Sequence, residues 1–158
     1  MKKLFALCIC LSFLVIAYAF TPKEETPAAA KTAFAAKFPT AQKVKWSIEK
    51  PGEYEVEFTF NKIESSALFD AAGKLLETEF EIKEGDLPQT VKATIAKDFA
   101  GYKLDEIEKS TDAKGVIAYE MEAAKGKAKL ELCFDANGKL VSKDPVKKEE
   151  KEEKEEKK

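Results

Sequence analysis

Residues 69–75 read Phe69-Asp70-Ala71-Ala72-Gly73-Lys74-Leu75, and residues 134–140 read Phe134-Asp135-Ala136-Asn137-Gly138-Lys139-Leu140. At the same spacing of 65 residues, Tyr-Glu-Val-Glu at 54–57 recurs as Tyr-Glu-Met-Glu at 119–122. Further upstream, at a spacing of 61 residues, a second group of positions matches: Pro27 with Pro88, Lys31 with Lys92, and Phe38 with Phe99. Matches that keep one order with a single gap indicate an internal duplication. The four extra residues of the second copy enter most simply at 110–115.

Each copy is predicted to be a helix followed by four antiparallel strands. After each matched proline, apolar side chains recur every four residues, as on one face of a helix: Ala30, Phe34 and Phe38, then Val91, Ile95 and Phe99. Apolar and polar residues then alternate, as in 53–60, which predicts half-buried strands. The segment 102–109 alternates poorly and predicts a β-bulge.

The predicted fold class is therefore α+β, with a first repeat at 27–82 and a second at 87–143. One helix covers one face of its sheet and leaves the other face open. The two sheets either join edge to edge or stand apart. The open face carries the following residues of the first copy, together with their counterparts in the second: Glu55, Glu57, Glu64, Ser66 and Leu68.

The two ends of the chain are predicted to lie outside the fold. Residues 1–19 have the basic start, apolar run and small-residue cleavage site of a secretory signal peptide. The apolar run is shorter than the roughly 20 residues that a spanning helix needs, so cleavage is favoured over an uncleaved anchor. Residues 20–26 form a linker, and 144–158 form a disordered Lys/Glu-rich tail. We expect a periplasmic or secreted protein that meets the membrane only through its signal peptide before cleavage.

Composition argues against several classes of function. The chain has no histidine and no arginine, and its net charge is −2. Readers of nucleic acid rely on arginine and on basic surfaces, so no nucleic-acid partner is expected. Without histidine, the usual serine and cysteine nucleophile systems and histidine-containing zinc sites are absent. Cleavage of the signal leaves Cys133 as a lone cysteine. We predict no enzyme activity, catalytic residue, cofactor or metal.

Several residues have both a structural and a functional interpretation. The Asp-Ala-x-Gly segments resemble parts of a calcium loop, but they lack its further oxygen ligands and fit a hairpin turn. Trp46 is either a ligand-binding aromatic or a core residue, and its phase with Val44 and Ile48 favours the core. Cys133 is out of phase with its neighbours and should point to the helix-free face. It is either an exposed thiol at a binding surface or a small apolar filler.

Three motifs together resemble a known family. They are Val44-Lys45-Trp46, the repeated Tyr-Glu-[Val/Met]-Glu and the repeated Phe-Asp-Ala-x-Gly-Lys-Leu. They are similar to the PepSY-like, β-lactamase-inhibitor-protein-like family of small exported bacterial proteins, common in Bacteroidetes, over about 27–142. The resemblance implies a tandem repeat with helices packed on one face of a curved antiparallel sheet, and a binding role without catalysis. It does not imply β-lactamase inhibition, because no inhibitory loop residues match. Ile107 replaces Trp46 in the second copy.

The predicted function is that of an exported, non-catalytic, inhibitor-like module. It would bind an unknown protein or peptide of the cell envelope through the helix-free sheet face. The predicted binding surface is Glu55, Glu57, Leu68, Glu120, Glu122 and Cys133. Two alternatives stay open: a carboxylate-based hydrolase of the envelope, and a divalent-cation-binding protein.

Overall fold

The computed structural model describes residues 25–146, which form one antiparallel sheet with two short helices. The first half contains α1 (Ala28–Lys37), β1 (Gln42–Lys50), β2 (Glu53–Phe60), β3 (Ile63–Asp70) and β4 (Leu75–Glu81). The second contains the 3₁₀ turn η1 (Glu84–Asp86), α2 (Gln89–Asp98), β5 (Lys103–Asp112), β6 (Ile117–Lys125), β7 (Ala128–Asp135) and β8 (Leu140–Pro145). In this part of the chain, no helix is long and apolar enough to cross a membrane. The predicted signal peptide and the charged residues from 147 onward lie outside the described residues.

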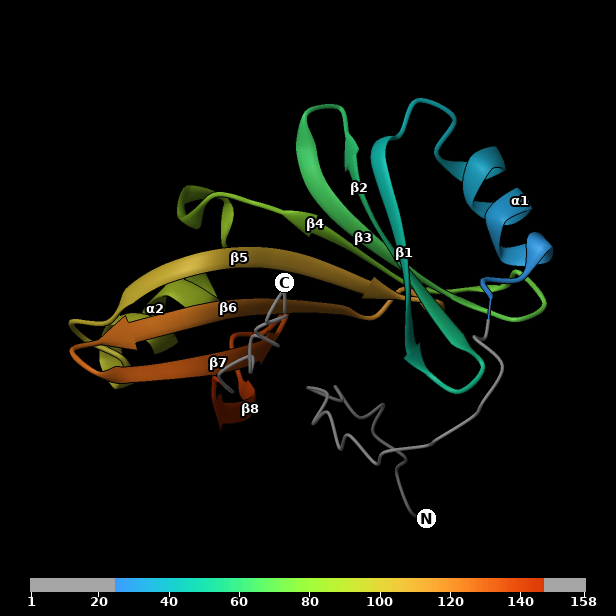
Figure 1. Cartoon of the computed structure of the whole chain (residues 1–158). Coiled ribbons are helices and arrows are strands. Elements are labelled where there is room, and N and C mark those ends of the chain that lie inside the picture. Colours follow the sequence, from blue (N-terminus) through green and yellow to red (C-terminus); the bar gives the residue numbers. More distant parts are fainter. Residues whose placement is uncertain (1–24, 147–158) are drawn as a thin grey trace, which may run out of the picture.

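The predicted tandem repeat, with its helices packed on one face of the sheet, is wrong. The strands form a single eight-stranded sheet in the order β1 to β8, because β4 pairs with β5 from Glu77–Asp112 to Glu81–Glu108. The helices form no common layer and lie at opposite ends of the sheet (Figure 1). Strand twist accumulates across eight strands, so a ten-residue helix covers only the strands nearest to it. The boundaries of the two predicted repeats stay a prediction.

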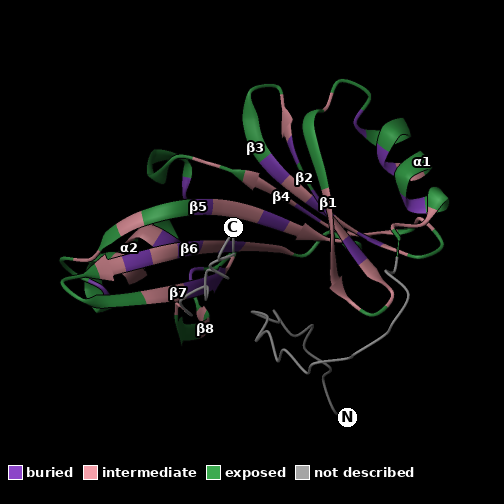
Figure 2. Cartoon of the chain, in the orientation of Figure 1, coloured by how far each residue is buried: buried purple, intermediate pink, exposed green. Residues whose placement is uncertain are grey.

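The core is divided into two clusters, one at each end of the sheet (Figure 2). In the first, Phe34 of α1 packs edge-on against Phe58 of β2, with ring centroids 5.0 Å apart. In the second, Val91 of α2 is fully buried, and Phe99 packs edge-on against Phe134 of β7. Burial of these side chains stabilises each end by about 1.5–3 kcal/mol per large apolar side chain.

The Asp-Ala-x-Gly segments form the predicted hairpin turns. Asp70 Oδ1 accepts the backbone N–H groups of Ala72 and Lys74, both at 2.9 Å. Asp135 repeats this geometry between β7 and β8. A third turn of the same kind, around Asp112, joins β5 to β6 and was not predicted. The carboxylates of these aspartates therefore accept hydrogen bonds from the backbone of their own turns.

The predicted bulge in 102–109 is confirmed. The pairing of β5 with β6 shifts between Asp105 and Glu108, and Glu106 has a positive φ of 47°. Ile107 of the bulged segment is buried in the second core cluster. The bulge therefore supplies an apolar side chain to the core from a stretch that alternates poorly.

Two of the turn glycines lie against helix backbones. A Cβ on Gly73 would lie 2.6 Å from the carbonyl oxygen of Ala29 in α1, and one on Gly138 would meet the backbone of Thr90 in α2. Gly115, in the third turn, has a φ of +79°, close to the +83° of Gly73, but it faces open space. Only the first two glycines therefore serve the packing of a helix against a hairpin.

We expect Gly73→Ala to destabilise the protein more than Gly115→Ala. Both place a side chain at positive φ, which costs about 1–2 kcal/mol. Gly73→Ala also overpacks the contact with α1, for about 1–3 kcal/mol more. Urea unfolding of both variants measures the difference, and equal losses would show that α1 does not need this close approach.

Candidate functional site

The residues of the predicted binding surface fall into two groups: Glu55, Glu57 and Leu68 on β2 and β3, and Glu120, Glu122 and Cys133 on β6 and β7. Within each group the residues are close, since Leu68 lies opposite Glu55 and Cys133 lies opposite Glu120. Strands β4 and β5 separate the two groups. The structure therefore does not bring the six residues into one contact set.

The strands in between carry acids on the same side. Successive residues of a strand point to opposite sides, so the register shows which residues share a side. Glu57 aligns through Ser66 with Glu79, and Glu81 aligns through Glu108 with Glu120. We define the acidic face as ten glutamates on this side of the sheet: Glu55, Glu57, Glu64, Glu77, Glu79, Glu81, Glu108, Glu120, Glu122 and Glu131.

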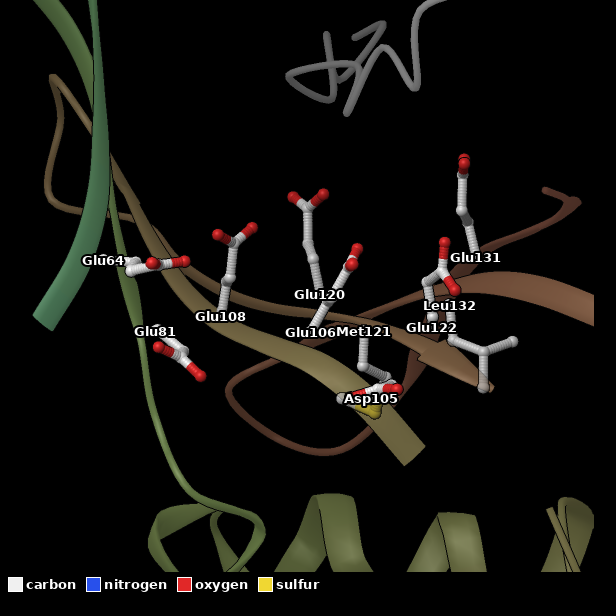
Figure 3. Close-up of a pocket in the computed structure, with 10 residues that line it drawn as sticks. All are labelled: Glu64, Glu81, Asp105, Glu106, Glu108, Glu120, Met121, Glu122, Glu131 and Leu132. Atoms are coloured by element: carbon white, nitrogen blue, oxygen red, sulfur yellow. The ribbon is translucent and has the colours of Figure 1, made fainter. Parts of the chain in front are cut away.

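Two adjoining hollows open on the acidic face, with volumes of about 340 and 380 Å³. Both are lined by Glu64 and Glu108, so they meet at these two residues. Apart from Lys43, every charged residue that lines either hollow is acidic. Figure 3 shows four carboxylates of the first hollow pointing to the same side of the strands, away from the helix below: Glu108, Glu120, Glu122 and Glu131.

Glutamates on the acidic face oppose one another directly across paired strands. Glu108 lies between Glu81 of β4 and Glu120 of β6 in the register. Glu122 of β6 lies opposite Glu131 of β7. Like charges placed directly opposite each other destabilise a sheet. The acidic face therefore works against the stability of the fold.

The pKa of Glu108 is raised to about 7, first by burial and then by repulsion from Glu79, Glu106, Glu55 and Glu81. Burial also raises the pKa of Glu79, where the hydroxyl of Ser66 donates to Oε2 at 2.7 Å and opposes the rise. The pKa of Glu55 is raised by burial, and then by Glu49 and Glu57. The centre of the acidic face is thus the place where negative charge is held at the greatest cost.

Lysines form ion pairs with two glutamates of the acidic face. Lys45 lies 3.0 Å from Glu57, and Lys129 lies 3.2 Å from Glu122. Both lysine side chains are more than half exposed, and ion pairs of this kind contribute about 0–1 kcal/mol. Each pair therefore involves one of the acids that line a hollow, Glu57 or Glu122, and neither lysine lines a hollow itself.

Three carboxylates lie close enough to reach one cation. Oxygen atoms of Glu77, Glu79 and Glu120 are within 4.8 Å of one another. Calcium takes six to eight oxygen ligands. One oxygen of Glu77 already accepts the hydroxyl of Ser110 at 2.7 Å. The cluster supplies only part of a coordination shell from side chains.

Two residues singled out in the sequence are buried or half-buried in the structure. Cys133 is 1% exposed, and its Sγ lies 4.0 Å from Oε1 of Glu120. The Cys133 side chain is buried beside Glu120, so its thiol is not exposed on the acidic face. Trp46 is half-buried and packs edge-on against Phe34, at 5.6 Å between ring centroids, as expected for a core residue.

The centre of the acidic face was missed in the sequence. The alternation of Glu77, Glu79 and Glu81 was visible, and it could have assigned β4 to the same side as Glu55. Glu108 gave no such signal, because it follows the bulge that breaks the alternation of β5. Its position depends on the pairing of β4 with β5.

A family model described as "Putative beta-lactamase-inhibitor-like, PepSY-like" matches residues 16–76 and 52–142. These two matches cover most of the chain, and the chain belongs to this family. The family predicted from the sequence motifs is therefore confirmed. No curated protein matches the sequence.

Solved structures from three Bacteroides species share the fold. A protein of Bacteroides eggerthii, described as "putative periplasmic", is 15% identical, with a TM-score of 0.72 over 78% of this chain and 91% of that one. A BLIP-like protein of Bacteroides fragilis is 22% identical, with a TM-score of 0.65 over 80% and 91%. A third, from Bacteroides uniformis, is 19% identical, with a TM-score of 0.69 over 76% and 89%. The periplasmic description agrees with the predicted location, and none of the three is described as an enzyme.

We expect the protein to become more stable as the pH falls from 8 to 5. Glu108 takes up a proton more readily in the folded state than in the unfolded state, whose ordinary pKa is 4.5. Its protonated form therefore favours folding below pH 4.5, and this contribution is lost as the pH rises through about 7. Thermal unfolding at a series of pH values measures the trend.

Glu108→Gln should raise the melting temperature at pH 8 and flatten the pH dependence. Glu84→Gln, at an exposed residue of η1, is the matched control and should change neither. A wild-type melting temperature that is lower at pH 5 than at pH 7 would contradict the electrostatic account of the acidic face.

Proposed function

We propose that this protein is an exported binding module that holds a protein or peptide of the cell envelope against the acidic face, without catalysis. The family and the fold support an inhibitor-like, non-enzymatic role. Of the predicted residues, Glu55 and Glu57 lie on β2 and Glu120 and Glu122 lie on β6, all on the acidic face, and Leu68 lies opposite Glu55. Cys133 belongs to the support of this surface rather than to its contacts.

The observation that carries this proposal is the pair of adjoining hollows. They open on the side of the sheet where opposed glutamates destabilise the fold. Each end of the sheet already has its own apolar core and helix. The acidic face contributes no comparable burial, and its opposed glutamates cost stability. Features that break the rules of stable design are expected at functional sites. A surface that opposes folding in this way therefore favours a role in binding.

The two alternatives from the sequence have weaker support. A carboxylate-based hydrolase needs one acid and one base on opposite sides of a bound substrate. Here Glu108 and Glu120, which lie opposite each other in the register, point to the same side of the strands (Figure 3). A divalent-cation protein needs more ligands than Glu77, Glu79 and Glu120 supply.

A pull-down from an envelope extract of the source bacterium tests the proposed function. We expect wild-type protein to retain at least one envelope protein. A variant with Glu55, Glu57, Glu120 and Glu122 changed to lysine should lose it, because the four changes reverse the charge of two acids in each hollow.

The matched control reverses four exposed acids that do not line the hollows: Glu25, Glu84, Asp86 and Asp98. It has the same net charge as the test variant and should retain the partner. Circular dichroism checks that both variants are folded. Retention of every partner by the folded test variant would refute binding through this surface.

A further inference from the structure

We propose that the acidic face binds an extended, lysine- or arginine-rich segment of another protein. The segment lies across the paired strands β4 and β5, which we call the β4–β5 joint. This inference rests on the proposed function and adds the chemistry of the partner. It commits to a cationic polypeptide rather than to a small ion, a neutral peptide or an apolar surface.

The sorting of charge over the molecule points to a cationic partner. The chain as a whole is nearly balanced, with 27 basic and 29 acidic residues. The two hollows do not share this balance, since Lys43 is the one base in their lining. The acid excess is thus specific to one surface. A partner of opposite charge would relieve the repulsion there, whereas a neutral partner would bury carboxylates without compensation.

The spread of the acids points to an extended segment. Glutamates of the acidic face occur on every strand from β2 to β7. At about 4.8 Å per strand spacing, these strands span about 24 Å. A single metal ion would neutralise one point of such a surface. An extended chain of about seven or eight residues covers the whole span, at about 3.3 Å per residue.

The two hollows also fit the periodicity of an extended chain. They meet at Glu64 and Glu108, so a chain that crosses these residues enters both. Alternate side chains of an extended segment point to the same side. Basic residues at every second position would therefore all face the acidic face, with the residues between them in solvent.

Glu108 gives binding by such a segment a distinct signature. It lies at the meeting point of the hollows, and its pKa is raised to about 7. A cation bound beside a carboxylate lowers its pKa. Binding near pH 7 should therefore release protons. Neutral contacts elsewhere on the molecule would not do so.

Calorimetry with the full mature protein tests this inference, using a nine-residue peptide in which lysine and serine alternate. We expect it to bind at least tenfold more tightly than the same peptide with glutamine in place of lysine. The triple variant Glu81→Gln, Glu108→Gln, Glu120→Gln should weaken binding by about tenfold or more, as expected for loss of several partly buried charge pairs. The heat at pH 7 should depend on the ionisation enthalpy of the buffer, since protons are released.

The matched control variant is Glu25→Gln, Glu84→Gln, Asp86→Asn, which has the same net charge and should bind like wild type. Equal weakening in both variants would show that overall charge, rather than the acidic face, attracts the peptide, and would overturn the inference. Binding of Ca²⁺ or lysine amide as tight as that of the peptide would also overturn it, because point cations would then suffice.

The pull-down separates this inference from the proposed function. If binding of an envelope partner depends on the acidic face but the lysine peptide does not displace the partner, the inference of a cationic segment is wrong. The proposed binding surface is then still supported. If changes to the acidic face do not affect binding of the partner, the proposed function is wrong as well. Displacement of the partner by the lysine peptide, but not by the glutamine peptide, supports both.

Discussion

The pairing of β4 with β5 is the constraint on which the rest of the molecule depends. It is the ladder that joins the two halves of the described sheet, each with its own helix and core. Along it, Glu77 lies opposite Asp112 and Glu81 lies opposite Glu108. Backbone hydrogen bonds hold these strands together while their side chains on the acidic face repel one another. The joint is therefore both the link between the halves and the centre of the acidic face.

This arrangement separates the tasks of the apolar cores and the acidic face. At each end of the sheet, aromatic and aliphatic side chains pack against the helix of that end, α1 or α2, and supply the stability of the fold. The acidic face is left with opposed glutamates and two hollows that meet at Glu64 and Glu108. Because stability comes from the cores, the acidic face can carry charge that folding alone would not favour. A cationic segment on the acidic face would remove the repulsion across the joint.

Local structure could be predicted from the sequence because its signals are local. The repeated Asp-Ala-x-Gly turns and the bulge before Glu108 follow from turn chemistry and broken alternation within a few residues. The single sheet could not be predicted, because nothing in the sequence states that Glu79 pairs with Ser110 rather than facing a free edge. For the same reason, the position of Glu108 at the centre of the acidic face could not be predicted. Glu55 and Glu120 were found by alternation within their strands, but their relation to Glu108 depends on the β4–β5 ladder.

The central claim is that the acidic face holds negative charge against the cost of burial and repulsion at the joint. Titration of the glutamate side-chain carboxyl carbons by nuclear magnetic resonance tests it most directly. The account predicts that Glu108 titrates at about pH 7, and that Glu55 and Glu79 titrate above their ordinary value of 4.5. Titration of all three near 4.5 would mean that these carboxylates are solvated and independent, and would contradict the account.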